Sequence, residues 1–387
     1  MRGDLYNRAP MHRFEWLAAA ALMVGCAAAP AYDNGGGGGG GGSGGAAATG
    51  GGGAGGTGGG GPVGPVVLPV PPGAANVPQP SGSPGNLKVV HWAGFKAALT
   101  YTFDDAQPSQ IEHYADLQGM GVPLTFYITT SSSSSSGSFD ATFSQAVRDG
   151  HEMGNHTVHH CQADLTNCSN TSSAATSLDA ELDDCTSYIV SHFGQPGVWT
   201  AASPYGDTGY DVPDMSRFFL NRGVGSGTIA PNDSTDPFNL PCHAAVEGET
   251  VDSFDAQIDG AESGGRWLIF LVHTVTPTSA SWYAPIDISV VTGSAAHAKS
   301  LGDVWIGAAV DVGAYWRAEK ALTAATPTTA GGVQTWSWTL PAHFPPGRSL
   351  RITVDGGTVS QMGAPVAWDG HGYYEISLDA GSLTLSP

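Results

Sequence analysis

Between residues 96 and 273 the chain alternates short apolar runs with segments of helical periodicity. The apolar runs, rich in β-branched and aromatic residues, predict strands at 96–103, 122–129, 151–155, 198–202, 223–229 and 267–273. The segments between them predict helices at 108–120, 139–149, 178–194, 211–221 and 252–263. Strands that alternate with helices build a parallel sheet or barrel. We therefore expect an α/β fold whose functional side chains follow the carboxyl ends of the strands.

The two ends of the chain differ from this pattern in composition. Residues 27–85 are dominated by glycine and then by proline, so they predict a disordered tether with nothing to bury. Beyond residue 330, short alternating segments separated by glycine turns predict a small all-β accessory domain at 331–387. The α/β domain is expected between them, at 86–325.

The first residues have the pattern of an export signal. The segment MHRFEWLAAAALMVGCAAAP (11–30) has a basic start, a short apolar run and a small-residue end, and is too short to span a bilayer. MVGC resembles a bacterial lipobox, so residues 1–26 predict a signal with Cys26 as the lipidated residue, against ordinary signal cleavage or a buried N-terminal helix. We expect an exported lipoprotein, at the outer membrane, cell surface or periplasm of a bacterium, or otherwise a secreted protein. A lipid anchor would be its one contact with a membrane.

The charge of the chain limits its partners. The formal net charge is −20, and binding of nucleic acid requires clustered Lys and Arg, so we expect no nucleic acid partner. The charge suits a neutral or cationic ligand. We expect the protein to act as a monomer.

Besides Cys26, four cysteines remain, which in an exported chain predict two disulfides. Three pairings are possible. We favour Cys161–Cys168, which closes a local loop, with Cys185–Cys242 joining distant segments. The alternative is a zinc–thiolate site, but no C-x-x-C spacing supports it.

Histidines cluster in GHEMGNHTVHH (150–160), which holds four of the thirteen in the chain. His156 and His160 are four residues apart, so in a helical turn both would project from one face and could bind one ion. His151 and His159 are interpreted as polar loop residues or hydrogen-bond partners of the ligands, not as ligands. Two histidines do not complete a metal site, so a third ligand is needed.

A pair of carboxylates follows the first predicted strand, in TFDDA (102–106). On its own such a pair favours a helix cap at Asp104 and a solvated Asp105. Together with the histidines, it can instead supply a third metal ligand and a base for proton removal.

Four short motifs resemble those of the polysaccharide deacetylase family (carbohydrate esterase family 4, the NodB homology domain). TFDDA (102–106) resembles its T-F-D-D-G motif, and HTVHH (156–160) resembles its H-[ST]-x-x-H motif. SPYG (203–206) is similar to the end of its R-x-P-Y-G motif, and LVH (271–273) to its late L-x-H motif. The resemblance covers about residues 90–322 and implies a distorted (β/α) barrel of the NodB deacetylase type.

The resemblance also implies a metal site. Asp105, His156 and His160 would hold a divalent metal, zinc in the first place, with Co, Ni or Mn as alternatives. Asp104 would be the general base and His273 the general acid.

For substrate binding, the resemblance implies that the backbone N–H of Tyr205 helps to bind the oxyanion. Pro204 and Tyr205 would line the substrate site. Trp282, just after the LVH segment, could stack on a sugar ring, although plain packing is equally compatible with its position.

Two departures from the family pattern bear on the mechanism. The third motif normally opens with an Arg that pairs with the base, and Ala202 stands in its place, so Asp104 is expected to lack that cation. The nearest candidates in sequence for another cation are Arg217 and Arg222. The Asp-Trp motif that orients the acid histidine is missing as such. DSTDP (233–237) offers Asp236 as a weak substitute, against the plainer interpretation of a turn-forming residue.

The function these residues predict is a metal-dependent hydrolase that removes acetyl groups from a polysaccharide or oligosaccharide through a metal-activated water. N-acetyl groups are the first expectation, and O-acetyl esters of the xylan type are the alternative. A second class is a glycan-binding surface lipoprotein with weak or no catalysis, which the missing Arg and Trp favour.

Overall fold

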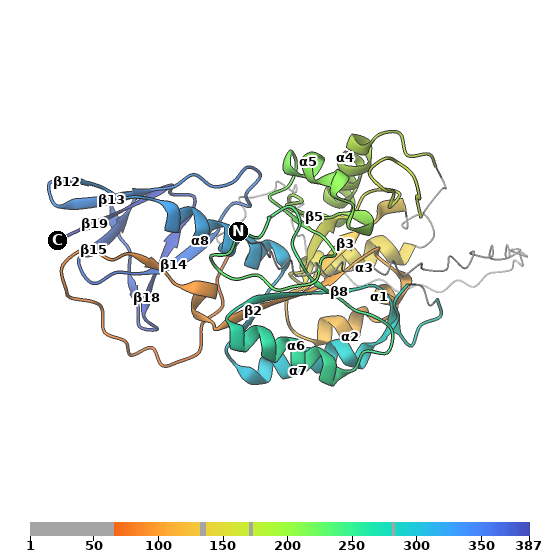
Figure 1. Ribbon diagram of the computed structural model, residues 1–387, viewed down its shortest axis with the longest axis horizontal. Helices are drawn as coiled ribbons and strands as arrows, with labels where there is room; N and C mark the ends of the chain where they lie inside the picture. The colour runs from red at the N-terminus through yellow and green to blue at the C-terminus, as the bar shows by residue number, and fades with distance from the viewer. Residues whose placement is uncertain (1–65, 132–136, 170–172, 281–282) are drawn as a thin grey trace, which may run out of the picture. The chain divides into compact units, whose positions relative to one another are not determined.

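An eight-stranded sheet of parallel strands forms the centre of the fold (Figure 1). The computed structural model describes residues 66–131, 137–169, 173–280 and 283–387. The sheet order is β6-β5-β4-β3-β2-β8-β7, with β11 paired to the first half of β2. The strands are β2 (Ala97–Phe103), β3 (Thr125–Ile128), β4 (Glu152–Asn155), β5 (Thr200–Ala202), β6 (Leu220–Arg222), β7 (His243–Ala244), β8 (Trp267–Val272) and β11 (Val304–Ile306).

The two edges of this sheet are connected by the segment 240–244. Leu240 forms a parallel bridge with Arg222 at the end of β6, and its carbonyl accepts from Gly223 N at 3.0 Å. Four residues further on, β7 pairs with β8 at the other edge. The sheet therefore curls toward a closed, distorted barrel, which confirms the predicted α/β fold class.

Helices cover both faces of the sheet. They are α1 (Pro108–Glu112), α2 (Tyr114–Gly119), α3 (Gly137–Arg148), α4 (Leu178–Tyr188), α5 (Asp211–Met215), α6 (Val251–Gly264), α7 (Ile288–Leu301) and α8 (Ala309–Ala324). The helix α8 lies on the face opposite most of the others, where Trp316 shares a buried cluster with Trp267 and Leu271. Figure 1 shows α6 and α7 side by side, and both begin with a side-chain N-cap. Within the described residues, no helix is both long and apolar enough to cross a membrane.

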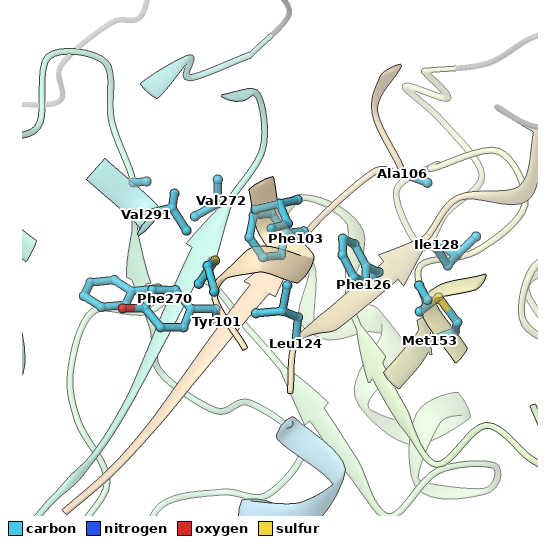
Figure 2. Close-up of a cluster of buried hydrophobic side chains, with 14 of the residues drawn as sticks. Tyr101, Phe103, Ala106, Leu124, Phe126, Ile128, Met153, Phe270, Val272 and Val291 are labelled. Carbon is cyan, nitrogen blue, oxygen red and sulfur yellow. The ribbon is translucent and has the colours of Figure 1, made fainter. Parts of the chain in front are cut away.

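The strand β2 is buried on both faces, as a central strand of a parallel sheet should be. On one face, Tyr101 and Phe103 belong to an aromatic core with Phe126 and Phe270 (Figure 2). The rings of Phe103 and Phe126 stack with centroids 5.2 Å apart. On the other face, Thr102 donates to Phe270 O at 2.7 Å. This packing fixes the point at which the strand ends and the two aspartates begin.

The predicted bounds of one helix and of the strand after it are wrong, although their order is as predicted. The sequence predicted a helix at 211–221 and a strand at 223–229, whereas α5 ends at Met215 and the strand β6 lies at Leu220–Arg222. Phe218, Phe219 and Leu220 are buried from several sides, so their apolar run does not distinguish a helix from a strand.

The C-terminal strands form two antiparallel sheets, β1-β14-β18-β17 and β12-β13-β19-β15-β16. Their bounds are β1 (Lys88–Val89), β12 (Thr328–Ala330), β13 (Val333–Ser337), β14 (Ser349–Thr353), β15 (Thr358–Gln361), β16 (Ala364–Pro365), β17 (Trp368–Asp369), β18 (Tyr373–Ser377) and β19 (Ser382–Ser386). In the α/β part, the short strands β9 (Val275–Thr276) and β10 (Ile286–Asp287) pair with each other in a separate sheet. Leu350 and Ile352 of β14 share a buried cluster with Trp316 of α8. The predicted accessory domain therefore has apolar contact with the α/β part.

The described end of the predicted tether, from residue 66, runs beside β14. The buried Arg351 donates to the carbonyls of Pro69 and Ala93 at 2.8 and 2.7 Å. The predicted signal, the lipidated Cys26 and the tether up to residue 65 lie outside the described residues.

The disulfide predictions are half right. Cys161 and Cys168 are bonded, as expected. Cys185 and Cys242 are both free and buried, so their predicted pairing is wrong. Cys185 lies in the aromatic core and Cys242 in the separate cluster that contains Trp316, and each Sγ donates to a backbone carbonyl instead.

Candidate active site

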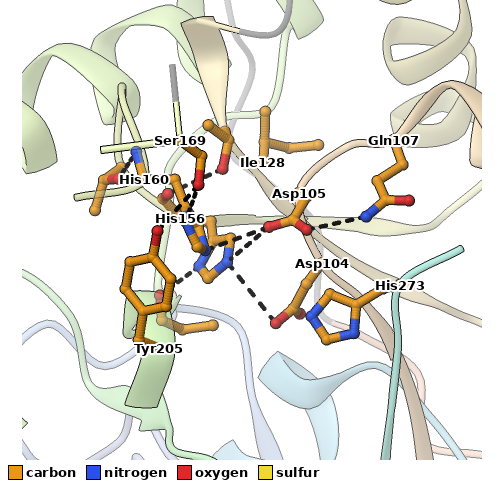
Figure 3. Close-up of polar contacts among 12 residues, drawn as sticks. Asp104, Asp105, Gln107, Ile128, His156, His160, Ser169, Tyr205 and His273 are labelled. Carbon is orange, nitrogen blue, oxygen red and sulfur yellow. Dashed lines mark hydrogen bonds and ion pairs between the residues drawn. The ribbon is translucent and has the colours of Figure 1, made fainter. Parts of the chain in front are cut away.

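The residues singled out by the motifs follow the carboxyl ends of neighbouring parallel strands. Asp104 and Asp105 follow β2, His156 follows β4, and His273 follows β8. Because these ends share one edge of the sheet, side chains far apart in the sequence meet there (Figure 3).

Asp105, His156 and His160 offer three ligand atoms that all lie within 4.8 Å of one another. Asp105 Oδ1 is 3.3 Å from His156 Nε2 and 3.4 Å from His160 Nε2. This oxygen is buried and has no hydrogen-bond partner, whereas Oδ2 accepts from Gln107 Nε2 at 3.1 Å. A buried carboxylate oxygen without a donor calls for a cation or a water, so the set fits a divalent metal with imidazole and carboxylate ligands.

Both histidines have their Nδ1 occupied, which leaves Nε2 facing Asp105. His156 Nδ1 lies 2.7 Å from the carbonyl oxygen of Ala202, which can only accept, so Nδ1 carries the proton. His160 Nδ1 lies 3.1 Å from Ser169 Oγ. Such contacts hold ligand rings in orientation and fix the tautomer that leaves Nε2 free for a metal.

The charges of the site favour a bound cation. Burial raises the pKa of Asp105, but hydrogen bonding and charge from His156, with His160 and His273, lower it well below its ordinary value. Burial and the neighbouring His156 lower the pKa of His160 to about 4, so its imidazole is neutral at neutral pH. A neutral imidazole and an ionised carboxylate are the forms that bind metal.

Burial also lowers the pKa of His156, but the charges of Asp104 and Asp105 outweigh this and raise it above the ordinary value. The negative charges of the two carboxylates stabilise a proton on this ring and would equally stabilise a metal ion at Nε2. A metal held at Nε2 of His156 would displace this proton.

Asp104 has a cationic partner, although Ala202 stands where the family motif has an Arg. Its Oδ2 pairs with Nη2 of Arg222, and the side chains are 4% and 1% exposed, so the pair is fully buried. The expectation from Ala202 is therefore wrong, because the charge comes from the end of β6, one strand further along the sheet. Oδ1 of Asp104 has no hydrogen-bond partner and is the oxygen left for proton transfer.

His273 faces the two carboxylates, and Figure 3 shows its ring beside Asp104. Burial lowers its pKa, partly offset by the charges of Asp104 and Asp105. Nδ1 of His273 is buried without a partner. Gln110 Nε2 donates to the carbonyls of both Asp104 and His273, at 2.6 and 3.1 Å, and so joins the backbones that carry base and acid.

The predicted substrate residues take different places. Pro204 is buried, whereas Tyr205 is 47% exposed and its ring lies 4.6 Å from that of His160. Tyr283, 69% exposed, contacts the edge of His273 with centroids 4.9 Å apart. Trp282 lies outside the described residues.

Asp236 is not brought to the site. It is exposed, and its Oδ1 accepts from Phe238 N at 2.9 Å, which is the turn-forming role the sequence offered as the plainer interpretation. Because Nδ1 of His273 has no partner, Asp236 does not orient this histidine.

The remaining histidines of the cluster do not join the ligand set. His159 binds Glu181 through Nδ1 at 2.6 Å, and His151 accepts from Leu124 N at 3.1 Å. Both are buried and not exposed loop residues. The helical turn expected for His156 and His160 is also wrong, because they lie in a loop in which His160 has φ 51°.

Left-handed backbone is concentrated in this site. Asp105 (φ 72°), Thr157 (φ 68°), His160 (φ 51°) and Tyr205 (φ 59°) are all non-glycine residues in that region. Such conformations cost about 1–3 kcal/mol each and persist where the surrounding structure imposes them. The surrounding fold therefore imposes the backbone conformations of Asp105, His160 and Tyr205.

The fold and the site together define an α/β barrel with a candidate mononuclear metal centre at its carboxyl edge. Residues 95–218 match the family model described as "Polysaccharide deacetylase". The match confirms the predicted family resemblance and covers the segments that carry Asp104, Asp105, His156, His160 and Tyr205. Arg222 and His273 lie beyond it. The chain matches no curated protein sequence.

Solved structures of deacetylases and esterases are similar in part of the chain. A structure titled "T48 deacetylase with substrate" is 17% identical, with a TM-score of 0.38, over 55% of this chain and 88% of that one. A family 4 acetyl xylan esterase from Clostridium thermocellum with a cobalt ion is 18% identical, with a TM-score of 0.36, over 56% and 89%. Peptidoglycan deacetylase PdaC from Bacillus subtilis is 16% identical, with a TM-score of 0.36, over 56% and 90%. Likenesses of this size carry no argument about activity or substrate.

Proposed function

We propose that this protein is a metal-dependent hydrolase that removes acetyl groups, N-acetyl groups in the first place, from a polysaccharide or oligosaccharide. One observation carries the proposal. Three buried polar atoms at one edge of the barrel, Asp104 Oδ1, Asp105 Oδ1 and His273 Nδ1, have no hydrogen-bond partner within the part of the chain that the structure describes. A base, a metal ligand and an acid at one edge of the sheet are what acyl hydrolysis requires.

Asp105, His156 and His160 would hold the metal, zinc in the first place. The ion would supply Lewis acidity that polarises the acetyl carbonyl and lowers the pKa of a water. Each of these ligands already faces the others with its binding atom free or paired within the set.

Asp104 takes the proton from the attacking water through Oδ1, while Oδ2 remains paired with Arg222. The pairing with the buried guanidinium holds the carboxylate in one orientation. His273 then gives a proton to the leaving nitrogen of the sugar. The backbone N–H of Tyr205 stabilises the charge that develops on the carbonyl oxygen.

The charge of the molecule favours a neutral or cationic glycan. The net charge is −20, and the cation found at the described site, Arg222, is buried and paired with Asp104. An acidic polysaccharide would meet no free cation there among the described residues. N-acetylated and partly deacetylated amino sugars have the expected neutral or positive charge.

The alternative function, a glycan-binding protein without catalysis, loses part of its support. That interpretation depended on the missing motif Arg and Trp; Arg222 supplies a cation to Asp104, while the Asp-Trp motif is still missing. Acetate release from an amide and from an ester substrate distinguishes N-acetyl from O-acetyl activity.

The test is acetate release by the zinc-loaded full chain from N-acetylglucosamine oligosaccharides and from acetylated xylan oligosaccharides. Asp104→Asn is the matched variant, because it removes the base and keeps the shape of the side chain. We expect release from the amide substrate, and a rate lower by about 10²–10⁴-fold in Asp104→Asn with unchanged metal content. Faster release from xylan would assign the ester activity instead. No release from either substrate by the metal-bound protein would refute the hydrolase.

A further inference from the structure

The loop closed by the Cys161–Cys168 disulfide begins at the residue after the metal ligand His160. Cys161 is fully buried, and its carbonyl accepts from the hydroxyl of Tyr210 at 2.8 Å. Inside the loop, Ala163 N donates to Asp207 Oδ2 at 2.9 Å. The loop is therefore fastened to the segment 204–210, which contains Tyr205.

The loop returns to the site at its far end. Asn167 accepts from the hydroxyl of Tyr205 at 2.6 Å, and Ser169 N donates to the carbonyl of His160 at 3.3 Å. Ser169 is thus placed over the ring of the ligand that the loop started from. The disulfide holds the two ends of the loop together directly beside both contacts.

Ser169 Oγ lies between two residues of the proposed site. It is 3.1 Å from His160 Nδ1 and 3.0 Å from the hydroxyl of Tyr205 (Figure 3). Because the Tyr205 hydroxyl donates to Asn167, Ser169 can donate to it and accept the proton of His160 Nδ1. This arrangement leaves His160 Nε2 unprotonated and facing Asp105.

The two histidine ligands differ in how they are held. His156 is 2% exposed and is bound by a backbone carbonyl of a central strand, which cannot move without the sheet. The side chain of His160 is 14% exposed, follows a left-handed turn, and is bound by the hydroxyl of an exposed serine. The orientation of His160 therefore depends on the loop.

We propose that Ser169 is a positioning residue for the metal ligand His160, and that the Cys161–Cys168 disulfide keeps Ser169 in place and so sustains the metal affinity of the site. This inference rests on the proposed metal-dependent function. It adds a residue outside the four motifs, supplied by a loop that contacts His160 and Tyr205.

The test is a zinc titration of the full chain against a chromophoric chelator, with the absorption spectrum of the Co²⁺-loaded protein as a second readout. Ser169→Ala removes the hydroxyl, and Ser169→Thr keeps it. Thr166→Ala is the matched control, because its hydroxyl binds Gln162 and Asp164 inside the same loop and does not contact His160. Cys161→Ser/Cys168→Ser opens the loop.

We expect Ser169→Ala to lower zinc affinity by about 10–100-fold, the usual effect of removing a hydrogen-bond partner of a ligand, and to change the Co²⁺ spectrum. Ser169→Thr and Thr166→Ala should bind zinc as the wild type does. The double cysteine variant should lose at least as much affinity as Ser169→Ala.

Wild-type affinity in Ser169→Ala would overturn the role of the serine, as would an equal loss in Thr166→Ala. Wild-type affinity in the folded double cysteine variant would overturn the role of the disulfide. If the double variant does not fold, the exposed Ser169 variants still decide the matter. A wild-type protein that binds no metal would instead refute the proposed function.

Discussion

The two ends of the barrel both bury carboxylates, but the carboxylates differ in the hydrogen-bond donors that they receive. At the amino end, Glu152 begins β4 and receives three donors, Thr125 Oγ1 at 2.9 Å, Thr200 Oγ1 at 2.6 Å and Val310 N at 2.9 Å. At the carboxyl end, Asp104 Oδ1 and Asp105 Oδ1 are also buried and have no donor among the described residues.

The difference separates structure from function. Leaving a buried acceptor without a donor costs about 1–3 kcal/mol, and other described carboxylates, Asp214 among them, also bear this cost. The oxygen of Asp105 differs from those because the Nε2 atoms of two histidines face it. The unsatisfied oxygens are explained if a cation and a substrate water complete them. The two following predictions test each end of the barrel in turn.

The largest expected effect is at the carboxyl end, in Arg222→Met. Removing the guanidinium leaves Asp104 buried without its main partner, which should cost about 3–5 kcal/mol of unfolding free energy in metal-free protein. Arg217→Met is the control, because Arg217 binds Asp179 and Asp183 at the surface, where a pair contributes about 1 kcal/mol or less. Urea unfolding of both variants measures the difference, and equal stabilities would remove the buried pair from the account.

A smaller effect is expected at the amino end, in Glu152→Gln. Burial raises the pKa of Glu152 from 4.5 to about 7, despite its three donors. Between these values the folded state holds a proton that the unfolded state has lost. The stability from this group is therefore complete below about pH 4.5, falls as the pH rises, and is gone above about pH 7.

Gln cannot titrate, so the stability difference between wild type and Glu152→Gln should shift against the wild type by at most about 3 kcal/mol from pH 4.5 to 8. Thermal or urea unfolding across this range measures it. A difference that stays constant with pH would show that Glu152 is ionised in the fold, and that the two ends of the barrel are more alike than described.

The sequence predicted the site where local patterns and the parallel sheet decide it. Asp105 and His156 converge because each follows a strand, and parallel strands share their carboxyl edge. Apolar runs located β2 and β8 to within a residue, since both are long and flanked by glycine or charged residues.

Contacts between distant segments were out of reach of sequence patterns. Arg222 lies 118 residues from Asp104, and its strand was placed a few residues too late. The apolar run before it was the available signal for an earlier strand. The support of His156 comes from a backbone carbonyl, that of Ala202, which no residue type reveals. The position of Ser169 beside His160 depends on the path of the loop closed by the Cys161–Cys168 disulfide, which the sequence does not specify.

The most direct test of the central claim, that the unsatisfied atoms at the carboxyl end form a metal site, is the metal content of purified protein after equilibration with Zn²⁺. Wild type and His297→Ala, a control on the surface of α7, should each retain a single ion per chain. His156→Ala should lose more than about 100-fold in affinity, since even partners of a ligand are worth 10–100-fold. A His156→Ala protein that is folded and retains the full metal content would contradict the account.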